Sequence, residues 1–532
     1  MTTLYQNARV LTPVAPEVTA FAVEGGAIVW TGTGAGAGRV DAAETVDLQG
    51  ALVTPAFVDA HFHTTAAGLA LGGLDLSAAG SLTEALDLVS AAARRRRGAV
   101  LLGTGWDETR WPEQRPPTER ELDRASWGSG VYLARIDVHS AVASSALLAV
   151  SGAATLDGYA GDGLVRLAAH HAVRAAALRS LSSADVAAAQ RLALSQAASL
   201  GIGCVHEMSG PEVAGLADLE SLLAIAAEPD RIDVVGYWGA IGDVETPLRL
   251  GLRGAGGDLF CDGAVGSHTA ALMTEYADAA GNRGALRYRA DELADHVVAA
   301  VEAGLQCGFH VIGDGAIDAA LSGFERAAAT LGRARVVAGR HRLEHVELAD
   351  DDAIARMARL GLVASVQPAF DRLWGGSDGM YAARLGSERA AAMNPFARFA
   401  AAGVPLCLSS DAPVTPLDPW GGVRAAVRHQ TPGFGLSPKA AFAAATRGGH
   451  RAAGDDESGV LALGAPATFA VWDAEPVPPS TAQARISAWA TDPWWTLTGL
   501  PDLAETPACL RTVVRGRTVF ESGSFASKEM SR

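Results

Sequence analysis

Two histidines, His61 and His63, end an apolar run that begins at Pro55. On a β-strand, side chains two residues apart point to the same side of the sheet. Two imidazoles held side by side in this way can bind one metal ion. Taken alone, a His-x-His pair is more simply explained as a coincidence of core or surface packing. The prediction of a metal site therefore depends on whether further metal-binding side chains lie near the pair.

Three more side chains of metal-binding type end later apolar runs, namely His310, His345 and Asp411. Each one alone is typical of a core histidine or a helix cap. Buried together, four imidazoles and a carboxylate would be costly unless they were paired, and one divalent cation would pair them all. Imidazole with carboxylate favours Zn²⁺, with Fe²⁺ or Mn²⁺ as alternatives, and disfavours Ca²⁺ and Mg²⁺.

An alternating pattern of β-rich runs and Ala-rich helical runs must position these side chains. Alternation favours a parallel sheet, and eight units favour a closed (β/α)₈ TIM-type barrel, whose sites lie at the carboxyl ends of the strands. An open doubly wound sheet is the alternative, but no Gly-x-Gly-x-x-Gly turn follows the first strand. The eight predicted strands are Ala51–Phe57, Ile202–Met208, Ile232–Trp238, Asp258–Cys261, Leu305–Ile312, Arg342–Val346, Leu362–Val366 and Val404–Leu408.

The two ends of the chain contain short strand-like runs separated by Gly-rich turns. We therefore expect residues 1–54 and 460–532 to form one small β-sandwich, and residues 55–459 to form the barrel. An insertion at about 70–195 separates the first two barrel strands, and insertions of this length usually cover a site. Within it, His139 and Trp106 are candidates for substrate contact, with loop packing as the alternative.

The composition narrows the classes of partner. The chain has 532 residues, 49% of them apolar, and its 43 basic and 59 acidic side chains give a net charge of −16. This acidic balance argues against nucleic acid and against a membrane surface, because both attract basic patches. The five cysteines are scattered and no export signal is visible, so we expect a cytoplasmic protein. A small-molecule substrate is expected, and a homo-oligomer is compatible with the fold.

The sequence resembles the amidohydrolase superfamily, in the branch called amidohydrolase family 3, near the N-substituted formamide deformylases. The resemblance implies a metal-dependent hydrolase that cleaves a non-peptide C–N bond, in an amide or N-substituted formamide, by attack of a metal-activated water. It also implies that Asp411 acts as general base and then acid, and that His345 hydrogen-bonds the carbonyl oxygen. It covers nearly the whole chain and rests on Pro55–His63, Gly105–Glu108, Asp137–Ser140, Asp262–Ser267, His310–Asp314, Arg342–His345, Ser410–Val414 and Asp418-Pro419.

One position departs from the family's pattern. Many relatives carry a carboxylated lysine on the fourth strand, where it bridges two metals, but this chain has Asp258 there. Its only lysines are Lys439 and Lys528, and neither lies near the end of any of the first seven strands. A carboxylated-lysine bridge is therefore excluded.

Two arrangements of metal remain open. In one of them, Asp258 bridges two ions, although its short side chain would need a backbone shift or a water to reach them. Asp258 could also contact substrate or only cap its loop. We favour the other arrangement, in which each chain binds one metal. Its ligands are His61, His63, His310 and Asp411, and His345 is a further ligand or a neighbour.

Other functions compatible with these residues are deamination, hydrolysis of a cyclic amide or ester within the same superfamily, and binding without catalysis at an altered site. All four histidines and Asp411 are present, and only the fourth-strand position differs. This pattern favours an altered enzyme over an inactive relative.

Overall fold

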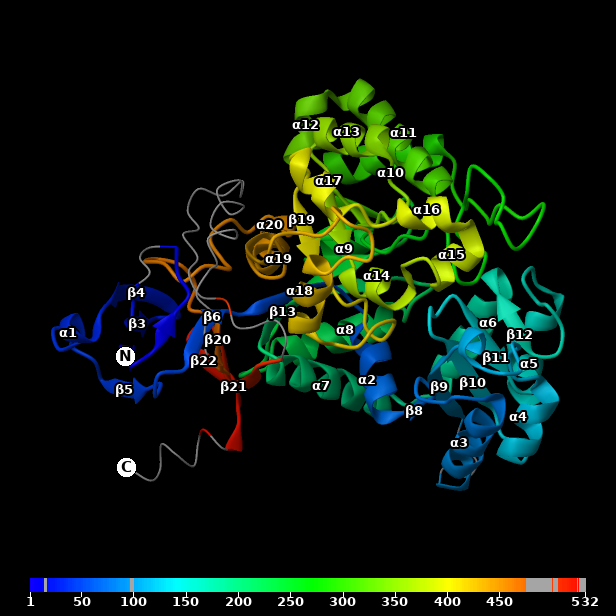
Figure 1. Cartoon of the computed structure of the whole chain (residues 1–532), viewed down its shortest axis with the longest axis horizontal. Helices are drawn as coiled ribbons and strands as arrows, with labels where there is room; N and C mark the ends of the chain where they lie inside the picture. Colours follow the sequence, from blue (N-terminus) through cyan, green and yellow to red (C-terminus); the bar gives the residue numbers. More distant parts are fainter. Residues whose placement is uncertain (14–16, 96–99, 475–499, 501–505, 524, 526–532) are drawn as a thin grey trace.

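The computed structural model describes residues 1–13, 17–95, 100–474, 500, 506–523 and 525. Its central body is an eight-stranded parallel sheet (Figure 1). A bridge between Phe62 and Ala412 joins the two edge strands, so the predicted (β/α)₈ barrel is confirmed. In sheet order the strands are β7 (Phe57–Phe62), β13 (Ile202–Ser209), β14 (Asp233–Trp238), β15 (Gly254–Ala255), β16 (Gln306–Val311), β17 (Arg342–His345), β18 (Val363–Val366) and β19 (Leu406–Leu408).

Two of the predicted strands are displaced from the observed ones. The run Ala51–Phe57 is mostly strand β6 (Leu52–Pro55), which pairs with β20 (Phe469–Asp473), and the first barrel strand begins only at Phe57. One apolar run thus supplies consecutive strands of two different sheets. The fourth barrel strand, β15, precedes the predicted Asp258–Cys261, which keeps only an isolated bridge to β16, between Phe260 and His310, after the backbone turn at Gly256 and Gly257.

Amphipathic helices cover the outside of the barrel, and α13 (Asp351–Leu360) shows how the sequence produces them. Its residues Ile354, Met357 and Leu360 recur at helical spacing and are buried. The carboxylate of Asp350 caps the first turn by accepting a hydrogen bond from the Ala353 amide, and Gly361 ends the helix in a left-handed conformation. Helices α10 (Ala290–Glu302) and α11 (Asp314–Leu331) pack in the same layer.

Both chain ends build a small β-sandwich beside the barrel, as predicted (Figure 1). The rings of Tyr5, Phe21 and Phe469 meet in its core with centroid separations of 5.0 to 5.1 Å. The first sheet contains β4 (Ala27–Gly32), β3 (Ala20–Glu24), β1 (Thr3–Gln6) and β5 (Glu44–Asp47). The second contains β2 (Arg9–Val10), β6, β20, β21 (Ala508–Val514) and β22 (Arg517–Glu521).

The insertion is a folded unit on the opposite side of the barrel from the sandwich (Figure 1). Trp106 and Trp111 are fully buried in its core. Its sheet has the order β12 (Leu164–Arg166), β11 (Ser140–Ala143), β10 (Val131–Arg135), β9 (Leu101–Trp106) and β8 (Leu74–Asp75). Its helices include α3 (Leu82–Arg95), α4 (Glu119–Ser126), α5 (Ser145–Ser151) and α6 (Leu167–Arg179).

No helix in the described part of the chain is long and apolar enough to cross a lipid bilayer.

Candidate metal centre

The barrel mouth brings together the side chains that the sequence singled out. His61 lies in strand β7, and His63 follows it at the start of α2 (Thr64–Gly72). Asp411 lies in the loop after β19. The Oδ1 atom of Asp411 lies 3.4 Å from Nε2 of His61 and 3.2 Å from Nε2 of His63, and all three side chains are buried. These atoms are close enough to be ligands of one ion.

The outer nitrogens of both imidazoles have partners that fix the orientation of the rings. The Nδ1 atom of His61 lies 2.8 Å from Oε2 of Glu344, and Nδ1 of His63 lies 3.0 Å from the carbonyl oxygen of Met208. Both partners are acceptors, so both Nδ1 atoms carry the proton and donate it. Each Nε2 is then the atom that a neutral ring presents to a metal, and an imidazole held in this way by its outer nitrogen is typical of metal ligands.

This geometry leaves polar atoms that only a cation would satisfy. Nε2 of His61 and Oδ1 of Asp411 are buried, and neither has a hydrogen-bond partner among the described residues. Lone pairs of two imidazoles and one carboxylate oxygen face one another across 3.2 to 3.4 Å. Such an arrangement is unfavourable in a buried site unless a positive charge lies between them. The donor set thus fits a divalent metal ion.

Asp258 reaches into this cluster directly. Its Oδ1 lies 2.9 Å from Nδ1 of His310, 3.7 Å from Nε2 of His345 and 3.8 Å from Nε2 of His61. Its Oδ2 lies 3.5 Å from Nε2 of His63. We call His61, His63, Asp258, His310, His345 and Asp411 the metal cluster from here on. The sequence analysis left two routes open for this short side chain, a backbone shift or a water, and these distances agree with the direct route.

Two glycines explain how so short a side chain reaches the cluster. Gly256 and Gly257 follow strand β15 and have φ values of 119° and 80°, so the backbone turns inward before Asp258. A Cβ atom at Gly256 would lie 2.3 Å from the carbonyl oxygen of Gly308 on the neighbouring strand, so only glycine permits this close approach. The sequence analysis named a backbone shift as one way for Asp258 to reach the metal, and this turn at Gly256 and Gly257 is such a shift.

His310 and His345 occupy different places around Asp258. His310 contacts Asp258 and does not share the compact groups formed by His61–His63–Asp411 and by His61–Asp258–His345. Nδ1 of His345 donates to Oε1 of Gln367 at 2.8 Å, and the amide of Gln367 donates in turn to Ser409. This chain of hydrogen bonds directs Nε2 of His345 toward Asp258.

Two residues of the metal cluster have an unusual backbone conformation. His345 and Asp411 have φ values of 70° and 56°, in the left-handed region that non-glycine residues rarely adopt. Strain of this kind costs on the order of 1–3 kcal/mol per residue and is typically retained at functional sites. The Asp411 loop is held by Asp59, whose carboxylate accepts hydrogen bonds from the amide and hydroxyl of Ser410.

Comparison with known proteins identifies the family. The model of the amidohydrolase family matches residues 44–520. The chain belongs to this family. It is 28% identical over 410 residues to the putative amidohydrolase YtcJ of Bacillus subtilis, with 72% of this chain and 74% of that protein covered. It is 26% identical over 503 residues to an N-substituted formamide deformylase of Arthrobacter pascens, with 87% and 91% covered.

A solved structure extends the comparison to the fold. An uncharacterized metal-dependent hydrolase from Pyrococcus furiosus superimposes with a TM-score of 0.71 at 27% identity. The match covers 88% of this amidohydrolase and 98% of that chain. The chain is therefore a hydrolase of the amidohydrolase family with a candidate metal site at its barrel mouth.

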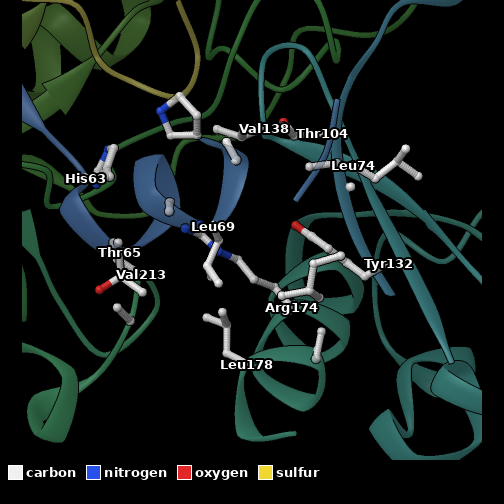
Figure 2. A pocket seen from close by; sticks show the side chains of 18 of the residues that line it. His63, Thr65, Leu69, Leu74, Thr104, Tyr132, Val138, Arg174, Leu178 and Val213 are labelled. Atoms are coloured by element: carbon white, nitrogen blue, oxygen red, sulfur yellow. The ribbon is translucent and has the colours of Figure 1, made fainter. Parts of the chain in front are cut away.

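Three cavities of this amidohydrolase meet at the metal cluster. The catalytic cavity, about 490 Å³, is lined by His63, Asp258, His310, His345 and Asp411 among others. A smaller aromatic cavity of about 320 Å³ shares His310, His345 and Asp411 with it and is walled by Phe370, Trp374 and Tyr381. The apolar cavity, about 740 Å³, lies between α2, α6 and the insertion sheet and also reaches His63 (Figure 2).

The two predicted substrate contacts from the insertion have different positions. His139 lines both the catalytic and the aromatic cavity, and its ring lies 5.2 Å from that of His310. Burial lowers the pKa of His139 to about 3, so the ring is neutral. Trp106 instead lies in the core of the insertion, where its indole donates to the carbonyl oxygen of Leu133 at 2.8 Å. It forms no part of these three cavity walls.

Several supporting residues escaped the sequence analysis. Glu344 could have been found, because it is the neighbour of His345 in the same strand and its side chain points to the other face. It is held by the fully buried Arg342, whose charge, acting against burial, lowers the pKa of Glu344 to about 2. Gln367 and Asp59 carry no local sequence signal, because their partners lie at a distance in the chain.

Proposed function

We propose that this amidohydrolase cleaves the C–N bond of a small amide, in particular an N-substituted formamide, with a metal-activated water. The observation that carries the proposal is the group of buried lone pairs on His61, His63 and Asp411, which calls for a cation where a substrate cavity begins. The N-substituted formamide deformylase among its relatives supports the choice of bond.

We further propose one metal per chain, held by His61, His63 and Asp411, with Asp258 completing a set of four donors. Zinc suits a set of imidazoles and carboxylates best, with iron or manganese as alternatives. A bound ion of this kind supplies a water of lowered pKa and polarises the substrate carbonyl. His345 lies beside His61 and Asp258, His310 contacts Asp258, and both histidines line the catalytic cavity within reach of the substrate.

Two residues then act on protons during hydrolysis. The carboxylate of Asp411 accepts a proton from the attacking water and delivers it to the departing nitrogen, as a general base and then a general acid. His345, in its protonated form, donates a hydrogen bond from Nε2 to the carbonyl oxygen as negative charge develops there. Its orientation toward the cavity is maintained by Gln367.

The unequal cavities support a small acyl group on one side of the bond. A formyl group is the smallest acyl group, and the aromatic cavity of about 320 Å³ is enclosed by three bulky rings. The apolar cavity is the larger of the two and would take the larger substituent on nitrogen. Under this assignment the scissile bond lies across the catalytic cavity, beside Asp411 and His345.

The test is the Asp411→Asn variant, reconstituted with metal and assayed on a panel of N-formyl and N-acyl amines. We expect wild-type protein to hydrolyse members of the panel and the variant to lose at least about 10²-fold, the usual contribution of a general acid–base group. Asp230→Asn is the matched control, because Asp230 is exposed and has a similar left-handed φ of 60°. Full activity in a metal-loaded Asp411→Asn variant would refute the proposed role.

A further inference from the structure

One arginine stands apart in the substrate region. Arg174, on helix α6, lines both the catalytic cavity and the apolar cavity, and no other lysine or arginine lines either one among the described residues. Figure 2 shows its side chain extended from α6 across the apolar cavity toward α2. The residues that share this junction with it include His63 of the metal cluster. A positive charge therefore lies where the two cavities join.

Within the described part of the chain, Arg174 has no carboxylate within ion-pairing distance. Two other arginines of this region are neutralised: Arg287 pairs with Glu212, and Arg135 contacts three carboxylates. Glu207 lines the apolar cavity too, but its Oε2 accepts both hydrogen bonds that Thr64 donates, at 2.6 and 2.8 Å.

A half-buried guanidinium among apolar walls is unfavourable unless an anion joins it. Burial raises the pKa of the nearby Asp218 carboxyl and the charge of Arg174 acts against this rise, but the two side chains lie beyond ion-pairing distance. The neighbouring histidines add no second positive charge. Burial lowers the pKa of His170 well below its usual value and that of His171 to about 4, so both rings are neutral. One cation without a partner matches a ligand with a single negative charge, and a carboxylate fits the fork of a guanidinium through two hydrogen bonds.

We propose that the substrate is an amide that carries a carboxylate next to an apolar substituent on its nitrogen side, and that Arg174 selects it by binding the carboxylate. The proposal rests on the proposed function. The amide would lie at the metal cluster, the carboxylate at the junction and the apolar group in the cavity beyond it. An N-formyl amino acid with an apolar side chain has this layout.

The reaction keeps the chemistry of the proposed hydrolysis. Water adds its oxygen to the formyl carbon, the C–N bond breaks, and the proton from water is delivered to nitrogen. The products are formate and the free amino acid, and no oxidant or further reactant is needed. Arg174 takes no part in these steps and acts only on which amide is bound.

The experiment uses a pair of substrates that differ in one group. N-formylleucine carries the carboxylate, and N-isopentylformamide has the same skeleton without it. With metal-loaded wild-type enzyme, we expect at least one enantiomer of N-formylleucine to be hydrolysed with a kcat/KM about 10- to 100-fold higher than N-isopentylformamide, the range for one charged hydrogen-bonding contact. Arg174→Met should abolish this preference, mainly by raising KM for N-formylleucine.

Two controls make the result specific. Arg179→Met removes an exposed arginine from the end of the same helix and should leave the preference unchanged. Calorimetric binding of N-formylleucine to the metal-loaded Asp411→Asn variant, with and without Arg174→Met, measures carboxylate recognition without turnover. Arg174→Lys should retain part of the preference, because the charge stays while the fork is lost.

The outcomes separate the two proposals. If amides are hydrolysed but wild-type enzyme prefers N-isopentylformamide, or if Arg174→Met lowers both substrates equally, the role of Arg174 is overturned. If no amide is hydrolysed but N-formylleucine binds and requires Arg174, the proposed reaction fails while recognition of the carboxylate stands. Neither hydrolysis nor Arg174-dependent binding would overturn both.

Discussion

Replacing Glu344 with glutamine tests how a buried ion pair next to the metal cluster contributes to stability and to metal binding. Glu344 accepts hydrogen bonds from Arg342 on one side and from Nδ1 of His61 on the other, and both charged side chains are fully buried. Glutamine keeps the volume and one acceptor oxygen but removes the negative charge. The substitution therefore leaves the guanidinium of Arg342 buried without a carboxylate.

The size of the effect follows from what Arg342 retains. Its remaining partners are the carbonyl oxygen of Ala60 at 2.6 Å, Ser365 Oγ at 2.9 Å, and the ring of Tyr237, whose centroid lies 4.9 Å away. Breaking a buried ion pair costs about 3–5 kcal/mol, and a desolvated cation–π contact retains about 2 kcal/mol. We expect Glu344→Gln to lose about 3 kcal/mol, a large share of the roughly 5–15 kcal/mol that stabilises a typical protein.

The assay is urea unfolding of the metal-free proteins, followed by metal affinity in competition with a coloured chelator. Loss of the acceptor behind a metal-binding histidine should weaken metal binding by about 10- to 100-fold. Glu325→Gln is the matched control, because Glu325 forms a two-point pair with Arg356 on the surface, where such pairs contribute about 0–1 kcal/mol. Equal destabilisation by the two variants would refute the reasoning.

Three further predictions address other parts of the molecule. Burial raises the pKa of Asp218 to about 6 from 3.8, so its ionisation opposes folding and stability falls as pH rises from about 4 to 6. Asp218→Asn, which keeps an acceptor for Thr65 and Gln190, should therefore be more stable than wild type by on the order of 2 kcal/mol at pH 7 and equal to it at pH 4 in thermal melts. Treatment with a chelator should abolish hydrolysis and lower the melting temperature, because a metal at 100 times its Kd adds about 2.7 kcal/mol to the free energy of unfolding. Elemental analysis of the enzyme after metal is restored should find about one metal per chain. Trp106→Ala should destabilise the protein by about 3–5 kcal/mol while leaving metal affinity unchanged, because the side chain belongs to the core of the insertion; a selective loss of metal instead would contradict this placement.

The histidines and Asp411 could be found from the sequence because the information is local. A His-x-His pair at the end of an apolar run gives both the strand and the direction of the side chains. The rule that barrel sites lie at the carboxyl ends of strands then brings distant segments to one rim. The same argument explains why the barrel and the sandwich could be predicted before their strands could be delimited.

The position of Asp258 required information that spacing does not contain. Two residues, Gly254 and Ala255, make up the whole fourth barrel strand, and the two glycines after it redirect the chain. A count of bonds in the side chain could therefore not tell whether a backbone shift or a water brings Asp258 to the cluster. Arg174 was missed for a related reason. Whether a charged side chain has an ion-pair partner depends on residues that are distant in the sequence and close only in the fold.

The pairing of β6 with β20 also sets an order for folding. Strand β6 leads through Ala56 into β7, which contains His61, but its partner β20 is made about 420 residues later. At roughly 5–20 residues per second, a ribosome needs about 20–80 s to reach it. During that interval the nascent chain has an apolar strand with an open edge, in the segment that leads to the candidate metal ligands His61 and His63. The enzyme should therefore depend on chaperones during synthesis more than its final stability suggests.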